Sequence, residues 1–172
     1  NQITQGPDNN MWVTLDDATK NVARITPAGV VTEYDLRGIA SPIGITSAGG
    51  NLWVTLNGAV ARFDPAAPEN AGTTVTTPLA DIADPRSITV GPDGNLWTAS
   101  GDKVLKIPPA APATATTYAA TGVMGARAIS RSGGFLWVAD CGGAQVVRVA
   151  TDGTGTAFAT GGGPQGVAGG AG

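Results

Sequence analysis

One tryptophan-containing sequence motif recurs along the chain at nearly constant spacing. It reads GPDNNMWVTL at 6–15, SAGGNLWVTL at 47–56, GPDGNLWTAS at 91–100 and SRSGGFLWVAD at 130–140. The four tryptophans, Trp12, Trp53, Trp97 and Trp137, are 41, 44 and 40 residues apart. A fixed period near 40 residues indicates a repeat architecture, in which a single repeat cannot bury its own apolar faces and must pack on its neighbours.

Each repeat contains the same four segments in the same order. An apolar run after Pro or Gly is followed by the tryptophan segment, then by a run that alternates apolar and basic residues, and finally by a threonine-rich run. The third segment reads NVARIT at 21–26, AVARFD at 59–64, KVLKIP at 103–108 and QVVRVA at 145–150. Period-two alternation between turn residues predicts strands. The expected fold class is therefore all-β, a β-propeller of four-stranded antiparallel blades with about four blades in this chain.

The repeat predicts structural roles for several residues. A large flat tryptophan ring fits between neighbouring blades, where it buries much area. Asp93 and Asp152 precede glycines, and turn formation explains them. Four basic residues share one register in the third segment and are expected to be solvated or stacked over a neighbouring blade: Arg24, Arg62, Lys106 and Arg148.

The repeat boundaries divide a single propeller domain, 1–172, into consecutive blades. The expected blades are approximately 1–38, 39–81, 82–122 and 123–162. The last ten residues, GPQGVAGGAG at 163–172, match SPIGITSAGG at 41–50 and are expected to be the first strand of a further blade. Two assemblies would accommodate this arrangement: the chain is part of a larger propeller, or it forms a homodimer in which two copies share one ring.

Composition disfavours several kinds of partner. The net charge of −3 and the pI near 4.7 leave no basic field for nucleic acid. No apolar run approaches the roughly 18 residues of a membrane span. The chain has few lysines and is rich in Thr, Gly and Ala, which favours a secreted or cell-envelope location.

Histidine is absent, and Cys141 is the single cysteine. Imidazole is the commonest general base near neutral pH and a common metal ligand, so its absence disfavours both kinds of site. One cysteine allows no internal disulfide. No His or Lys cluster adjoins Cys141 in the sequence to activate it, and we expect a buried or inert thiol.

The repeats resemble those of the streptogramin B (virginiamycin B) lyase family and, more widely, NHL-like propellers. The resemblance rests on GPDGNLW at 91–97, VARITPAG at 22–29 and TEYDL at 32–36, and it extends along all 172 residues. It implies a propeller, which in that family has seven blades. It also implies an elimination that opens a cyclic depsipeptide, with Mg²⁺ near the channel mouth and a histidine as the base.

Two recurrent positions carry histidines and acids in that family. The first, directly after the proline of the first strand or at the same register, is occupied here by Asn1, Ile43, Arg86, Arg127 and Gln165. The second, three residues after the tryptophan, is occupied by Leu15, Leu56, Ser100 and Asp140. Asp140 alone could bind a metal, so we expect no catalytic residue in this chain. Whether the protein is an enzyme stays open, because catalytic residues can lie on other blades or chains.

The innermost strands of a propeller line its channel, so these positions predict a polar ring at one mouth. The candidate ligand-binding residues are Asn1, Arg86, Arg127, Gln165 and Asp140. Guanidinium and amide groups suit the carboxylate or phosphate of a small anionic ligand. The alternative is structural pairing of the two arginines with Asp84, Asp81 or Asp102.

The acidic loop LDDATKN at 15–21 is a candidate metal site. Asp16, Asp17 and Asn21 offer oxygen ligands of the kind that Ca²⁺ prefers. Their spacing matches no established loop motif, so a solvated turn is the favoured interpretation. We expect no cofactor, with Mg²⁺ or Ca²⁺ as the alternative.

The function favoured by these observations is a non-catalytic β-propeller that binds a ligand or a protein partner. The alternative is a streptogramin B lyase-like, Mg²⁺-dependent C–O lyase that inactivates the antibiotic. In that case the catalytic residues lie on blades or chains absent here. A metal-dependent lactonase-like hydrolase is a third hypothesis, disfavoured by the same shortage of ligands.

Overall fold

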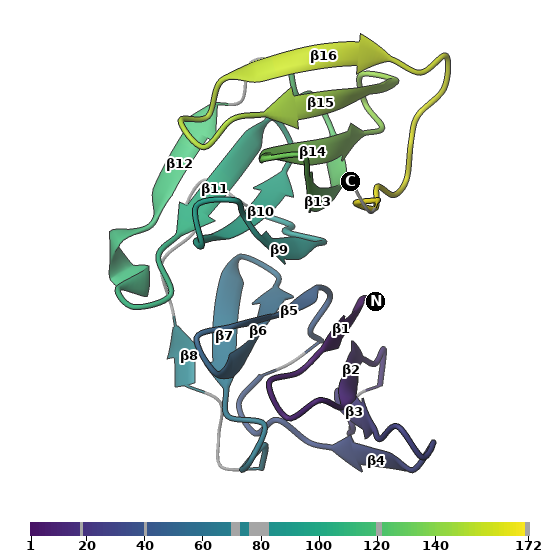
Figure 1. Cartoon of the computed structure of the whole chain (residues 1–172), viewed down its shortest axis with the longest axis vertical. Helices are drawn as coiled ribbons and strands as arrows, with labels where there is room; N and C mark the ends of the chain where they lie inside the picture. The colour runs from purple at the N-terminus through teal and green to yellow at the C-terminus, as the bar shows by residue number, and fades with distance from the viewer. Residues whose placement is uncertain (18, 40, 70–72, 76–82, 120–121, 171–172) are drawn as a thin grey trace.

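The computed structural model describes residues 1–17, 19–39, 41–69, 73–75, 83–119 and 122–170. Its strands form four antiparallel four-stranded sheets, which we call blades 1 to 4 in chain order. The prediction of an all-β propeller built from such blades is confirmed. In Figure 1 the blades are arranged as an arc, with the first strand of each blade on the inside and the fourth on the outside.

The strands of blades 1 and 2 come from the first 75 residues. Blade 1 consists of β1 (Ile3–Gln5), β2 (Met11–Thr14), β3 (Val22–Ile25) and β4 (Val31–Tyr34). Blade 2 consists of β5 (Ile45–Ala48), β6 (Asn51–Leu56), β7 (Ala59–Phe63) and β8 (Thr73–Val75).

Blades 3 and 4 repeat the same order. Blade 3 consists of β9 (Ile88–Val90), β10 (Leu96–Ser100), β11 (Lys103–Ile107) and β12 (Thr116–Ala119), with the short 3₁₀ helix η1 (Pro112–Thr114) before its last strand. Blade 4 consists of β13 (Ala126–Ser132), β14 (Phe135–Asp140), β15 (Gln145–Val149) and β16 (Gly155–Ala159).

The turn before the second strand of a blade, which carries the tryptophan, shows why the motif is repeated. Gly94 has φ +75°, a conformation that favours glycine, and the Gly91 N–H donates to the Asn95 carbonyl at 2.8 Å. Asp93 accepts the indole N–H of Trp97 at 3.0 Å, as Asp8 does from Trp12 in blade 1. The turn therefore closes the hairpin and also satisfies a polar group that the ring would otherwise bury unpaired.

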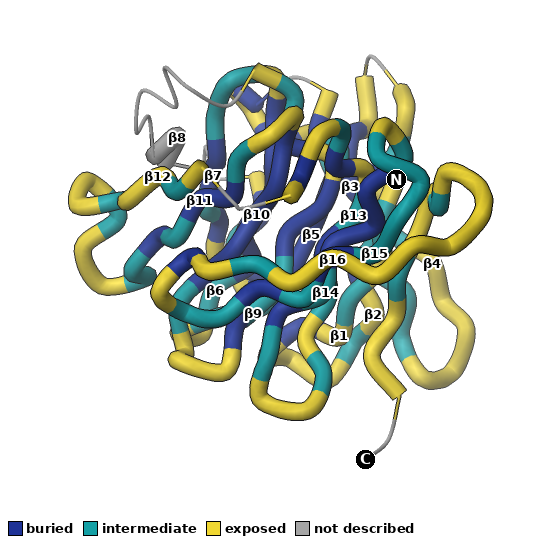
Figure 2. The backbone as a smooth tube through the Cα atoms, turned by 90° about the horizontal axis from the view of Figure 1, so that it is seen from above, coloured by how far each residue is buried: buried dark blue, intermediate teal, exposed yellow. Residues whose placement is uncertain are grey.

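The tryptophans of blades 1, 2 and 3 pack against the next blade along the chain. Trp12, Trp53 and Trp97 are at most 1% exposed. Each lies in a cluster with the residue before the tryptophan of the following blade, which is Leu52, Leu96 or Leu136. Figure 2 shows the buried strands in the interior and exposed turns around them. Burial of such side chains is worth about 1.5–3 kcal/mol each, so these contacts join the blades.

The basic residues of the third strands stack on rings, as expected, but on rings of their own blade. Arg62 lies 5.6 Å from the Trp53 ring centroid, and Lys106 lies 5.6 Å from that of Trp97. Each is the cross-strand partner of the tryptophan it covers. The cross-strand pairing explains why each basic residue stacks within its own blade, because directly opposite residues share one face of a sheet.

The described part of the C-terminal segment, residues 163–170, contains no strand. A first strand pairs with the tryptophan strand of its own blade, and the described residues hold no further tryptophan strand. The segment returns to the inner edge of blade 4, where the Gly169 N–H donates to Ser130 Oγ at 3.0 Å (Figure 1).

Candidate functional site

A cavity of about 550 Å³ lies at the axis of the arc, where the inner strands and the C-terminal segment meet. All five residues at this first-strand register line it: Asn1, Ile43, Arg86, Arg127 and Gln165. Equivalent positions of successive inner strands face the same axis, which is why one repeat register supplies the wall. The structure thus brings the predicted residues Asn1, Arg86, Arg127 and Gln165 to one cavity. Ligand binding there stays a prediction.

A second cavity of about 330 Å³ adjoins the first. Arg86 and Arg127 line both cavities. Ser100 and Cys141 line the second one. Two exposed guanidiniums therefore lie where the two cavities meet, and either cavity can present an anion to them.

The two arginines differ in their partners. Arg86 donates to Asp84 Oδ2 from Nε and from Nη2, both at 2.7 Å, and the two side chains are 47% and 46% exposed. An exposed pair of this kind contributes about 0–1 kcal/mol, so an incoming anion can compete with it. Within the described residues Arg127 has no ion pair. Asp81 lies outside the described residues. The structural-pairing alternative therefore holds for Arg86 with Asp84.

Gln2 lines the first cavity and holds its inner strands together, a role that the sequence analysis missed. Its Nε2 donates to the Ile88 carbonyl at 3.1 Å, and its Oε1 accepts the N–H groups of Ile45 and Ile88 at 3.1 and 3.3 Å. One side chain thereby links blades 1, 2 and 3. Its signal in the sequence is slight, because a glutamine beside a short strand matches no motif.

Asp140 has a structural role that excludes it from the candidate site. It is 0% exposed and does not line either cavity. Its carboxylate accepts the N–H groups of Met124, Gly125 and Gly143 at 3.1, 2.6 and 3.1 Å, and Gln145 Nε2 at 2.7 Å. These donors occupy the oxygens, so Asp140 holds the loop before β13 and the turn after β14 together.

Two of the three candidate metal ligands in the acidic loop 15–21 have structural partners. Asn21 is buried; its Nδ2 donates to the Ile39 carbonyl at 2.5 Å, and its Oδ1 accepts the Leu36 N–H at 2.8 Å. Asp17 caps a turn by accepting the N–H groups of Thr19 and Lys20, which lowers the pKa of its carboxyl. Asp16 is exposed. Across the described ranges, no three acidic or thiol side chains form a group able to hold a metal ion.

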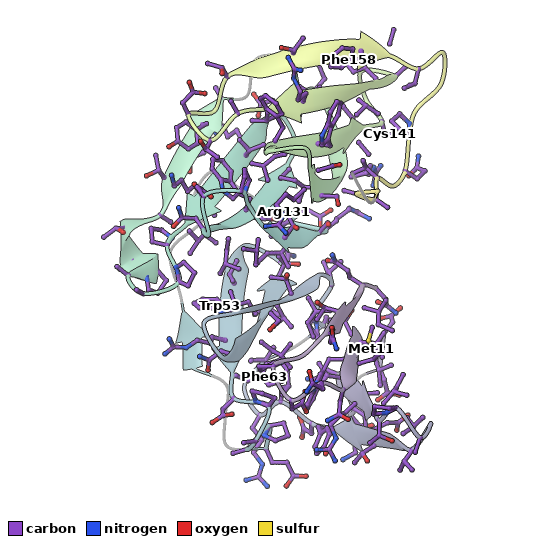
Figure 3. The ribbon with its side chains drawn as sticks, in the orientation of Figure 1. Met11, Trp53, Phe63, Arg131, Cys141 and Phe158 are labelled. Atoms are coloured by element: carbon purple, nitrogen blue, oxygen red, sulfur yellow. The ribbon has the colours of Figure 1, made fainter. Side chains whose placement is uncertain are left out.

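Cys141 is half-buried on the wall of the second cavity rather than fully enclosed. Gln165 Nε2 donates to its sulfur at 3.1 Å. Figure 3 shows Cys141 close to the C-terminal segment. The hydrogen bond joins this segment to blade 4. It also holds the Gln165 amide at the wall of the first cavity, which Arg86 and Arg127 line as well.

The solved structures most similar to the chain include streptogramin B lyases, two of them virginiamycin B lyase from Staphylococcus aureus. They have TM-scores of 0.72–0.76 and 22–25% identity, and the match covers 91–99% of this chain. The chain spans 53–59% of their length. One is a catalytically inactive histidine-to-alanine variant with quinupristin.

Propellers of other kinds match as well. A chain of a nidogen–laminin complex has a TM-score of 0.80 at 14% identity, with 97% of this chain and 67% of that one covered. The extracellular domain of a one-component system from B. thetaiotaomicron has a TM-score of 0.63 at 17% identity, with 92% and 24% covered. No protein-family model and no curated protein matches the chain. The likeness therefore establishes the fold.

Proposed function

We propose that the chain is a binding module whose axial cavity takes a small anionic ligand through a carboxylate or phosphate group. The observation that carries the proposal is Arg127, an exposed guanidinium on both cavities that has no ion pair within the described residues. Arg86 supports it from the same wall, and the amides of Asn1 and Gln165 add donors. A fork of guanidinium donors fits such an anion in bidentate geometry.

The expected contribution of Arg127 follows from its chemistry. A hydrogen bond to a charged group is worth about 1.5–3 kcal/mol, which corresponds to a roughly ten- to hundredfold change in dissociation constant. Arg86 contributes less, because the anion must first displace Asp84. The chain as a whole carries a net charge of −3. The attraction for an anion therefore comes from the arginines at this cavity and not from the overall charge.

Isothermal titration with inorganic phosphate and with succinate tests the proposal. Wild type binds at least one of these anions, and Arg127→Gln weakens binding by about ten- to hundredfold. Arg37→Gln removes the same charge from an exposed residue that lines neither cavity, and it leaves binding unchanged. Equal binding by wild type and Arg127→Gln contradicts the proposal.

A second candidate, a Mg²⁺-dependent C–O lyase, is favoured by the likeness to streptogramin lyases. The virginiamycin B lyase variant solved with quinupristin is catalytically inactive because a histidine is replaced by alanine. This chain contains no histidine. A lyase would therefore need catalytic residues from outside this sequence. Mg²⁺-dependent turnover of quinupristin by a protein that joins this chain to blades carrying such residues would favour the lyase over the binding module.

Export of the protein is part of the same proposal. The Thr-, Gly- and Ala-rich composition and the likeness to an extracellular propeller domain both support a secreted or cell-envelope location. Among the described residues, helices with the length and apolar character of a membrane span are absent.

A further inference from the structure

A third cavity, of about 410 Å³, lies between blades 1 and 2. It shares no lining residue with the first and second cavities. Blade 1 contributes Arg24 from β3 and Tyr34 from β4, and blade 2 contributes the loop 65–69 after β7. Its volume is within the roughly 300–1,000 Å³ of small-molecule sites.

Arg24 is a cation without a counter-charge among the described residues. It has the register of Lys106, since each is the cross-strand partner of a tryptophan that an aspartate precedes by four residues. Lys106 pairs with Asp93 at 2.8 Å. Arg24 forms no such pair with Asp8; its guanidinium carbon lies 5.6 Å from the Tyr34 ring centroid, and its Nε is buried without a hydrogen-bond partner. Because no described residue binds its two terminal nitrogens, they are available to a ligand in the cavity.

The loop of blade 2 supplies an apolar wall and one carboxylate. Pro65 and Pro68 are buried and line the cavity. The Asp64 carboxylate accepts the Ala66 N–H at 2.8 Å, which fixes the start of the loop. Glu69 is exposed, lines the same cavity and has no ion pair within the described residues. The cavity wall therefore combines one cation, one carboxylate that does not neutralise it, and apolar proline surface.

We propose that this cavity binds an α-amino acid with an apolar side chain. The α-carboxylate accepts hydrogen bonds from the Arg24 guanidinium, the ammonium group pairs with Glu69, and the side chain packs on the two prolines. A zwitterion satisfies both charges of the wall at once. A simple anion is repelled by Glu69, and a simple amine is repelled by Arg24. The site is separate from the axial cavity and does not rest on the function proposed for it.

Blades 2 and 3 form a matched cavity that lacks the carboxylate. The sequence PAAP precedes Glu69 and recurs at 109–112, where alanine follows it. The second PAAP loop lies against Arg62 at a cavity of about 290 Å³, and no acidic residue is among the described residues that line it. This cavity should not hold a zwitterion, so Arg62→Gln is the matched control for Arg24→Gln.

Isothermal titration with L-phenylalanine and L-leucine tests the proposal. Wild type binds at least one of them, and Arg24→Gln and Glu69→Gln each weaken binding by about tenfold or more. Glu69 is exposed, so its substitution leaves the fold intact. Arg62→Gln leaves binding unchanged. For phenylalanine, the analogues 3-phenylpropanoate, which lacks the ammonium group, and 2-phenylethylamine, which lacks the carboxylate, bind about tenfold more weakly or worse.

Arg127→Gln separates this site from the axial cavity, because both sites offer a guanidinium to a carboxylate. The proposal predicts that this variant binds the amino acid like wild type. Binding that is lost in Arg127→Gln and kept in Arg24→Gln overturns the proposal and supports the axial anion site instead. A wild type that binds neither amino acid, or that binds 3-phenylpropanoate as tightly as phenylalanine, also overturns it. The phosphate titration is independent of these results.

Discussion

Replacing Asp93 with asparagine tests the account of the repeated turn. Burial opposes ionisation of Asp93, but hydrogen bonds from Lys106, Trp97 and Asn95 outweigh it and lower its pKa from 3.8 to about 2. That fall corresponds to at most ~2.4 kcal/mol of stability. Because the turn is exposed, solvent screening reduces the expected loss in Asp93→Asn to about 1 kcal/mol at neutral pH.

The sign of the pH dependence follows from the lowered pKa. The contribution of Asp93 is fully present above the unfolded pKa near 3.8 and is lost as pH falls towards 2. Urea unfolding followed by tryptophan fluorescence should therefore show a gap between wild type and Asp93→Asn at pH 6 that narrows steadily below pH 4. A gap of equal size at pH 6 and pH 2 refutes the reasoning.

Asp8 provides a matched control that isolates the effect of the ion pair between Asp93 and Lys106. It occupies the same place before Trp12 and accepts hydrogen bonds from Trp12 and Asn10, but in the described part of the chain it has no ion pair. Burial opposes ionisation there too, and the hydrogen bonds still lower the pKa of Asp8. Asp8→Asn should cost less than Asp93→Asn, because only Asp93 pairs with Lys106, at 2.8 Å. Equal costs would show that the ion pair contributes nothing.

Three further substitutions test the packing and the assignment of roles, with urea unfolding as the common assay. Leu136→Ala empties a fully buried site against Trp97 and should cost about 2–5 kcal/mol; a loss below 1 would contradict this packing. Asn21→Ala leaves the Leu36 N–H and the Ile39 carbonyl unpaired, and each unpaired group should lower the free energy of unfolding by about 1–3 kcal/mol unless water replaces the amide. Asp140→Asn should lower stability by about 1.5–3 kcal/mol and leave anion affinity unchanged; weakened anion binding would return Asp140 to the site.

The repeat made the fold and the cavity wall predictable from sequence. The four tryptophans fixed the period, and the resemblance to the streptogramin B lyase repeats singled out the register that holds Arg86, Arg127 and Gln165. Because a propeller turns equal positions of successive inner strands towards one axis, their convergence follows from the fold. The indole acceptors Asp8 and Asp93 were open to the same argument, since each lies four residues before a tryptophan.

Contacts outside the repeat were not predictable in this way. Asn21 bonds to Leu36 and Ile39 across a hairpin, and Asp140 collects donors from the loop before its blade. Both residues resemble metal ligands in sequence, and only the direction of their side chains shows that they are structural. Gln2 reaches Ile88 across 86 positions, a contact that no local pattern encodes.

The most direct measurement of the central claim is an NMR titration of the arginine Nε–Hε signals with inorganic phosphate. The account predicts that the Arg127 signal, and to a lesser extent that of Arg86, shifts and saturates. The signals of Arg37, which lines neither cavity, and of Arg62, which stacks on Trp53, stay in place. An Arg127 signal that does not move, or arginine signals that all shift together without saturation, would contradict an anion site at the axis of the blades.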